Sequence, residues 1–126
     1  MKANDSRFVN QNDIRTDHFV FDLNPNWWSR PYEYAWAAEF VQQDDIALDA
    51  ACGVGHPFKF YLQDHCKDVY ACDIDPRIMS EKEIKKEVEL SFGKSALNIF
   101  KKEYITDIKY QLATLTNLSY KDNFFD

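Results

Sequence analysis

The sequence predicts an α/β fold in which a parallel β-sheet is flanked by helices. Between residue 31 and the end of the chain, three short apolar runs suited to strands alternate with longer stretches of helical periodicity. Such alternation favours right-handed β-α-β units within one sheet. The 126 residues are 45% hydrophobic and 16% aromatic, which suits one globular domain with a buried core.

The first 30 residues predict an arm that precedes this domain. The arm holds one candidate strand, residues 18–23 (HFVFDL), and then the stretch NPNWWSRP, whose two prolines predict turns. A helix is expected over residues 31–43, because Pro31 stands where proline is favoured, at the first helical position. One face of this helix carries aromatic residues at helical spacing: Tyr32, Trp36 and Phe40.

A strand is expected at residues 46–51 (IALDAA), a run that is too short for a helix and apolar enough for a buried position. Two of the chain's three glycines, Gly53 and Gly55, follow it. A second helix is expected over residues 56–66 and a second strand over residues 68–75 (DVYACDID). The glycines therefore stand in a turn between a strand and a helix.

Helices fill most of the remaining sequence. Asp75, which precedes a proline, is a good N-cap signal and predicts a third helix over residues 76–90 that Gly93 ends. A further helix is expected over residues 94–103. A third strand over residues 108–114 (IKYQLAT) completes the pattern.

Composition and charge exclude several classes of protein. No apolar run approaches the ~20 residues of a membrane helix, and the polar N-terminus is unlike a secretory signal, so we expect a cytoplasmic protein without membrane contact. The net charge is −6, and the stretch 81–103 balances six lysines with five glutamates. This pattern indicates a solvated helix face, so nucleic acid is not an expected partner.

No metal site is predicted. Cys52, Cys66 and Cys72 are odd in number and lack a C-x-x-C pair, so they are expected to be reduced core thiols. Asp73 and Asp75 form a D-x-D pair, which could hold a divalent cation and a nucleotide diphosphate, as in glycosyltransferases. Asp75 is better explained as a helix cap.

The glycines and Asp73 together predict a nucleoside site. In a parallel sheet, ligands bind beyond the carboxyl ends of the strands. A turn without side chains at Gly53 and Gly55 lets the backbone approach a ligand, although it could also be only a tight connection. Asp73 closes the second strand about twenty residues after Gly53, where a carboxylate can accept hydrogen bonds from both ribose hydroxyls.

Two phosphate-binding patterns are missing from the sequence. Phe58 replaces the third glycine of G-x-G-x-x-G and is too bulky for close packing against a pyrophosphate. The complete phosphate-loop pattern G-x-x-x-x-G-K-[ST] does not occur either, because Val88 stands where the first glycine before Gly93-Lys94-Ser95 would be needed. The expected ligand is therefore a nucleoside without a pyrophosphate.

Three stretches, ALDAACGVGHPFKFYLQ, VYACDIDPRIM and LSYKDNFFD, resemble in this order the class I S-adenosylmethionine-dependent methyltransferases. The family's patterns are an acidic residue before G-x-G, a hydrophobic strand that ends in an acid, and an LPF-x-D-x-x-FD stretch. The resemblance implies a Rossmann-like cofactor domain over residues 31–126, after the arm at residues 1–30. This domain would hold the first three strands in the order 3-2-1 and stop before the fourth, so an incomplete sheet is expected.

The resemblance also implies S-adenosylmethionine as the cofactor and assigns its contacts. Asp49 would orient the glycine turn and lie near the methionine amino group, and Asp73 would bind the ribose. Thr114 stands where the family often has an aspartate bonded to the adenine amino group, which is a departure from the family pattern. The other implied contacts come from Ala51, Cys52, Gly53, Gly55, Ile74 and Leu115.

The implied activity is methyl transfer to an acceptor that the sequence does not identify. In-line attack on a sulfonium methyl expels a neutral leaving group, so orientation can supply much of the acceleration, and no catalytic residue is assigned. His56 could act as a general base, but a helix-start residue is the preferred interpretation. The alternatives are a non-catalytic S-adenosylmethionine-binding or assembly module and, less favoured, a glycosyltransferase that uses the D-x-D pair.

Two features have no assigned partner or role. The interval from Asp75 to Thr114 is longer than usual for the family, which suggests an extra helix over residues 94–103. The strand at residues 46–51 is expected to leave an edge unpaired, and such edges favour self-association.

Overall fold

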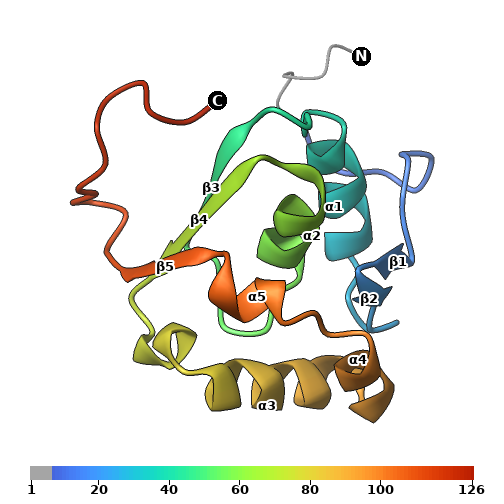
Figure 1. Ribbon diagram of the computed structural model, residues 1–126. Helices are drawn as coiled ribbons and strands as arrows, with labels where there is room; N and C mark the ends of the chain where they lie inside the picture. The colour runs from blue at the N-terminus through green and yellow to red at the C-terminus, as the bar shows by residue number, and fades with distance from the viewer. Residues whose placement is uncertain (1–6) are drawn as a thin grey trace.

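The computed structural model describes residues 7–126 and shows an α/β fold with helices beside a three-stranded parallel sheet (Figure 1). The first six residues of the predicted arm lie outside this range. The strands are β3 (Ile46–Ala50), β4 (Asp68–Asp73) and β5 (Lys109–Leu112), and β4 is central. This arrangement confirms the predicted strand order.

The main core lies between the sheet and the helices α2 (Phe58–His65) and α3 (Glu81–Phe92). Burial of each large apolar side chain there contributes about 1.5–3 kcal/mol. The following core residues are at most 1% exposed: Phe21, Phe60, Val69, Ala71, Ile78, Ile84 and Val88. No helix within residues 7–126 is long and apolar enough to cross a membrane.

The helix α1 (Arg30–Ala38) has its proline in the first turn, as predicted. It ends earlier than the expected residue 43. The chain turns toward β3 there, because Asp45 accepts a hydrogen bond from the Gln42 N–H at 2.8 Å and returns one from its own N–H to the Gln42 carbonyl at 3.2 Å. Two-way bonding of this kind fixes the turn that starts the sheet.

The arm contributes to the core, and its candidate strand is a hairpin. The strands β1 (His18–Phe19) and β2 (Phe21–Asp22) pair antiparallel around Val20, whose φ is 65°. The expectation of one continuous strand over residues 18–23 is therefore wrong. The physical reason is that Phe19 and Phe21 pack into two different core clusters, and the chain reverses between them.

The expected helix over residues 76–90 is also divided. Asp75 caps a 3-10 helix, η1 (Pro76–Met79), and accepts the Arg77 backbone N–H at 3.0 Å, so its predicted capping role is confirmed. Ser80 then starts α3, and its hydroxyl accepts the Glu83 N–H at 3.3 Å. The break occurs because S-x-x-E is a helix-start signal that separates the two helices. Gly93, with φ 87°, ends α3 as predicted.

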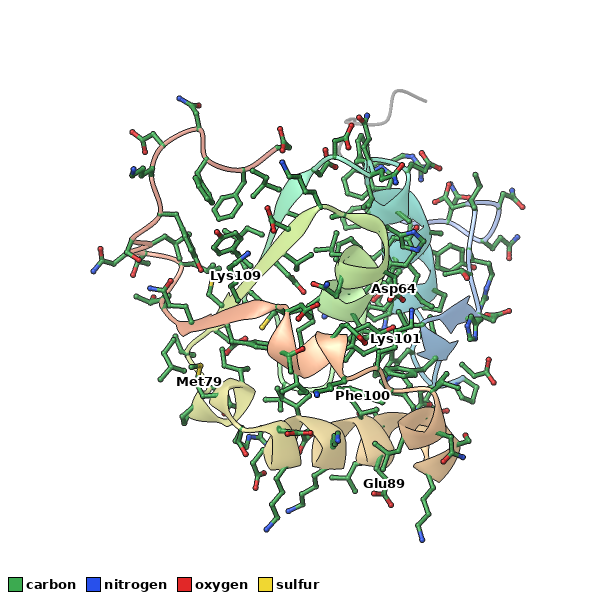
Figure 2. The ribbon with its side chains drawn as sticks, viewed as in Figure 1. Asp64, Met79, Glu89, Phe100, Lys101 and Lys109 are labelled. Atoms are coloured by element: carbon green, nitrogen blue, oxygen red, sulfur yellow. The ribbon has the colours of Figure 1, made fainter. Side chains whose placement is uncertain are left out.

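The segment after α3 completes the core. The expected single helix over residues 94–103 is replaced by two short ones, α4 (Lys94–Asn98) and α5 (Glu103–Thr106). Phe60 of α2 contacts Phe100 and Tyr104, with ring centroids at 5.3 and 4.8 Å. Asp64 of α2 binds Lys101 Nζ at 2.8 Å (Figure 2) and the Tyr104 hydroxyl at 2.7 Å. This segment therefore holds α2 in place.

The sheet has a second face and one edge that the helices do not cover. On that face, the Tyr70 ring of β4 packs against Tyr120, Phe124 and Phe125, with centroids 5.4–5.9 Å apart. At the edge, the Ile46 N–H and carbonyl of β3 bond to the side chain and backbone of Asp126 at 2.8 and 3.0 Å. Self-association through the rest of this edge stays a prediction.

The turn after β3 has an unusual backbone at two residues. Ala51 has φ 57° and Gly53 has φ 68°, both in the left-handed region that favours glycine. A Cβ at Gly53 would also collide with the His56 ring. Gly55 is constrained by packing instead, because a Cβ there would lie 2.9 Å from Glu87 Cβ and 3.0 Å from the Glu87 carbonyl carbon of α3.

Two substitutions in this turn should change stability in opposite directions. We expect Gly55→Ala to lower the free energy of unfolding by about 1–3 kcal/mol, because the backbone of α3 must move to admit the methyl group. We expect Ala51→Gly to raise it by up to about 1 kcal/mol, because glycine removes the left-handed strain. Urea unfolding followed by circular dichroism measures both. An unchanged midpoint for Gly55→Ala would show that α3 does not press on this turn.

Candidate functional site

The predicted site residues lie at the end of the sheet where its parallel strands finish. Because β3, β4 and β5 are parallel, the segments that follow them emerge on the same side. The glycine turn follows β3, Asp73 ends β4, and Thr114 and Leu115 come shortly after β5. A hydrogen bond of 3.0 Å from the Ala113 N–H to the Asp73 carbonyl joins the ends of β4 and β5.

Asp73 connects the end of β4 to the glycine turn. Its Oδ2 accepts the Gly53 N–H at 2.9 Å, and its Oδ1 accepts the Asp75 N–H at 2.9 Å. The backbone of the turn is joined to β4 as well, because the Cys52 N–H donates to the Cys72 carbonyl at 2.9 Å. A carboxylate has about four acceptor positions, so Asp73 can still accept hydrogen bonds from two hydroxyls of a ligand.

A cavity of about 260 Å³ opens beside Asp73. Its lining comes from the glycine turn, the loop after β4, the helix α3 and the N-terminal arm. The lining residues are Trp27, Gly53, Val54, Gly55, His56, Asp73, Asp75, Arg77, Glu87 and Ser91. Three of the predicted cofactor contacts, Gly53, Gly55 and Asp73, therefore border one cavity.

The charged groups around this cavity are mainly acidic. Asp73, Asp75 and Glu87 supply three carboxylates, and Arg77 supplies one guanidinium. Arg77 bridges Asp75 and Glu87 with contacts of 2.8 Å to each, and its hydrogen bonds hold the pKa of Asp75 below the usual value. Because Arg77 occupies the Asp75 carboxylate, the structure favours the helix-cap interpretation of this residue over the metal interpretation.

Lys59 of α2 holds the glycine turn through hydrogen bonds from its side chain. The sequence analysis did not identify this residue. Its side chain is fully buried, and Nζ donates to the carbonyls of Gly53 at 3.0 Å and His56 at 2.7 Å. Burial lowers the pKa of Lys59 to about 8. The available signal was a lysine among the apolar residues of FKFYL, where a helix turns its side chains toward the core.

Asp49, on β3, is the predicted contact for the methionine amino group. Burial raises the pKa of Asp49 to about 6, and the Asp73 carboxylate acts in the same direction, while Lys59 opposes both. The charge of Asp49 therefore changes close to neutral pH. This position suits a carboxylate that gains a cationic partner when a ligand binds.

The three cysteines are free thiols, as predicted. Cys52 is buried in the turn and its Sγ lies 3.3 Å from the Gly53 carbonyl. Burial raises the pKa of Cys52 to about 12, so the thiol is neutral. Within residues 7–126, no three His, Cys, Asp or Glu side chains gather in an arrangement that could hold a metal ion.

Three of the predicted cofactor contacts, Ile74, Thr114 and Leu115, lie on the surface and are not part of the cavity lining. Ile74 is 76% exposed and Leu115 is 59% exposed. Thr114 is exposed too, and its hydroxyl lies 3.1 Å from the Thr116 hydroxyl. Exposed apolar side chains at the ends of β4 and β5 could be covered by a bound planar group.

Comparison with known proteins identifies the family. A family described as a methyltransferase domain matches residues 48–126, from within β3 to Asp126. No curated protein and no solved structure matches the chain. The matched residues make up more than half of the sequence and include the glycine turn, Asp73 and Thr114. The chain therefore belongs to the class I S-adenosylmethionine-dependent methyltransferase family.

Proposed function

We propose that this methyltransferase domain binds S-adenosylmethionine at the carboxyl edge of its sheet and uses it to methylate an acceptor. The observation that carries the proposal is the Asp73 carboxylate, which is held by the Gly53 and Asp75 N–H groups beside a cavity. These bonds orient the carboxylate before any ligand arrives, so little ordering is needed on binding.

Four of the predicted contacts have proposed roles that fit their surroundings. Asp73 would accept the ribose hydroxyls, and ionised Asp49 would attract the methionine amino group. Ile74 and Leu115 would cover the faces of the adenine ring. When bound, S-adenosylmethionine supplies an electrophilic methyl group on a sulfonium sulfur. The contribution of the chain's own residues is to bind and orient this group for in-line attack.

The charge of the cavity supports a cationic nucleoside over a nucleotide. Three carboxylates against one guanidinium leave an excess of negative charge, which attracts a sulfonium and repels a diphosphate. This argues against a dinucleotide such as NAD, and against the nucleotide sugar of the glycosyltransferase alternative. Binding of S-adenosylmethionine without methylation of any acceptor would instead fit a non-catalytic module.

Asp73→Ala should weaken S-adenosylmethionine binding at least tenfold. Hydrogen bonds to a charged acceptor contribute about 1.5–3 kcal/mol each, and 1.4 kcal/mol corresponds to a tenfold change in affinity. The matched control is Asp75→Asn, which keeps a capping side chain and should change affinity much less. Isothermal titration calorimetry measures both, with NAD and a nucleotide sugar plus Mn²⁺ as competing ligands.

Two results of that titration would contradict the proposal. Binding of NAD but not S-adenosylmethionine would show that the cofactor is wrong. A larger loss for Asp75→Asn than for Asp73→Ala, with folding intact by circular dichroism, would favour the metal interpretation of the D-x-D pair. Since Asp73→Ala also removes the acceptor of the Gly53 N–H, Asp73→Asn is the variant to use if the alanine variant unfolds.

S-adenosylmethionine binding should strengthen as the pH rises from 5 to 7. With a pKa of about 6, Asp49 is mostly neutral at pH 5 and mostly ionised at pH 7, which gives about a tenfold gain in affinity. Asp49→Asn should bind more weakly at pH 7 and should show a flat profile. Burial lowers the pKa of His56, so a slope that survives in Asp49→Asn would assign the titration to His56 instead.

The same group should affect folding in the opposite direction. Because the pKa of Asp49 is raised on folding, its contribution to stability is fully present below pH 3.8 and is lost as the pH rises through about 6. Urea unfolding at pH 5 and pH 7 should therefore show that Asp49→Asn gains stability relative to the wild type at the higher pH. An equal difference at both pH values would mean that Asp49 is not buried.

A further inference from the structure

Trp27 lies outside the matched family domain and yet lines its cavity. It belongs to the turn between β2 and α1, whereas the family match begins at residue 48. Its indole borders the same cavity as Gly53 and Asp73. The N-terminal arm therefore supplies part of a site whose other known parts lie in the methyltransferase domain.

Two ring contacts hold the Trp27 indole at the cavity. It stacks on the His56 ring with centroids 5.7 Å apart and planes inclined by 27°. It meets the Phe92 ring of α3 edge to face, with centroids 5.4 Å apart. Aromatic pairs of this geometry contribute beyond the burial of their area, so both contacts favour one position of the indole.

The backbone before Trp27 is also fixed. The Trp27 N–H donates to the Asn24 carbonyl at 3.0 Å, and the Asn26 N–H donates to Asn24 Oδ1 at 2.9 Å. Upstream, Phe21 is 1% exposed and its ring lies 5.0 Å from that of Phe92, the same residue that Trp27 contacts. The hairpin in the core thus sets the place of the turn that carries Trp27.

The neighbouring tryptophan shows that this placement is selective. Trp28 is 78% exposed, whereas Trp27 is only partly exposed and points its ring into the cavity lining. The two tryptophans are adjacent in the sequence, so residue type alone does not explain why one is exposed and the other lines the cavity. Trp28 is therefore a matched control for Trp27.

The chemistry of this wall suits the proposed cofactor. An indole face is negative at its centre, so it attracts cations and stacks on planar rings. Burial lowers the pKa of the adjacent His56, which favours the uncharged imidazole in this wall. Together with the carboxylates of the cavity, this aromatic surface favours a ligand that is cationic and carries a planar base.

We propose that Trp27 is a cofactor-binding residue, delivered by the N-terminal arm to form one wall of the S-adenosylmethionine cavity. This inference rests on the proposed function. It goes further by assigning a binding role to a residue that precedes the family domain.

The test compares Trp27→Leu with Trp28→Leu, using calorimetric titration with S-adenosylmethionine. Trp27→Leu should weaken binding about 5- to 30-fold, the range expected when a desolvated aromatic contact is lost. Trp28→Leu should stay within about twofold of the wild type. Circular dichroism establishes that each variant is folded, and Trp27→Phe, which keeps a ring for Phe92, is the second variant if leucine disrupts the fold.

A second measurement reads the indole directly. In the Trp28→Phe/Trp36→Phe variant, Trp27 is the sole tryptophan, and its fluorescence should change in a saturable way as S-adenosylmethionine is added. Folded Trp27 variants that bind as tightly as the wild type, or an unchanged emission at saturation, would overturn the role of Trp27 while leaving the cofactor assignment in place. A wild-type chain that does not bind S-adenosylmethionine would overturn both.

Discussion

The hydrogen bond from the Gly53 N–H to Asp73 Oδ2, 2.9 Å long, is the contact on which the site depends. It joins two segments that are separated in sequence by a whole helix and that belong to neighbouring strands. The positive φ of Gly53 aims the N–H at the carboxylate, and the parallel pairing of β3 with β4 brings the two strand ends together. This bond fixes the loop after β3 against the acid that ends β4, so that the two border one cavity.

Burial of polar groups around this contact has both a cost and a use. Lys59 is fully buried, and its ammonium compensates by donating to the carbonyls of Gly53 and His56. The same burial leaves Asp49 with a pKa of about 6, so the unliganded site holds a carboxylate that is readily neutralised. A cationic ligand would reverse that penalty, because it favours the ionised carboxylate. The stability of the turn and the affinity for a cation are therefore linked through the same few residues.

The sequence was sufficient where local pattern and topology agree. Alternating strands and helices predicted the order of the sheet, and Gly53 and Asp73 could be paired because parallel strands bring their carboxyl ends together. The sequence predicted that Gly55 lets a ligand approach the backbone, but it did not show that the close packing of α3 also requires a residue without a side chain there. The hairpin around Val20, the lysine under the turn and the indole of Trp27 depend on contacts between distant segments, which no local pattern records. The break at Ser80 was visible as S-x-x-E, but the apolar stripe on both sides of it favoured one helix.

The most direct test follows the backbone amides of the turn by ¹H–¹⁵N NMR while S-adenosylmethionine is added. If the ligand binds beside the Gly53–Asp73 contact, the largest shift changes should be at the Gly53 and Asp75 amides, both of which donate to Asp73. Changes that cluster instead around Asp64 and Lys101, where a separate cavity of about 400 Å³ lies near the end of α2, would contradict this placement. A spectrum that does not change at any ligand concentration would contradict the binding itself.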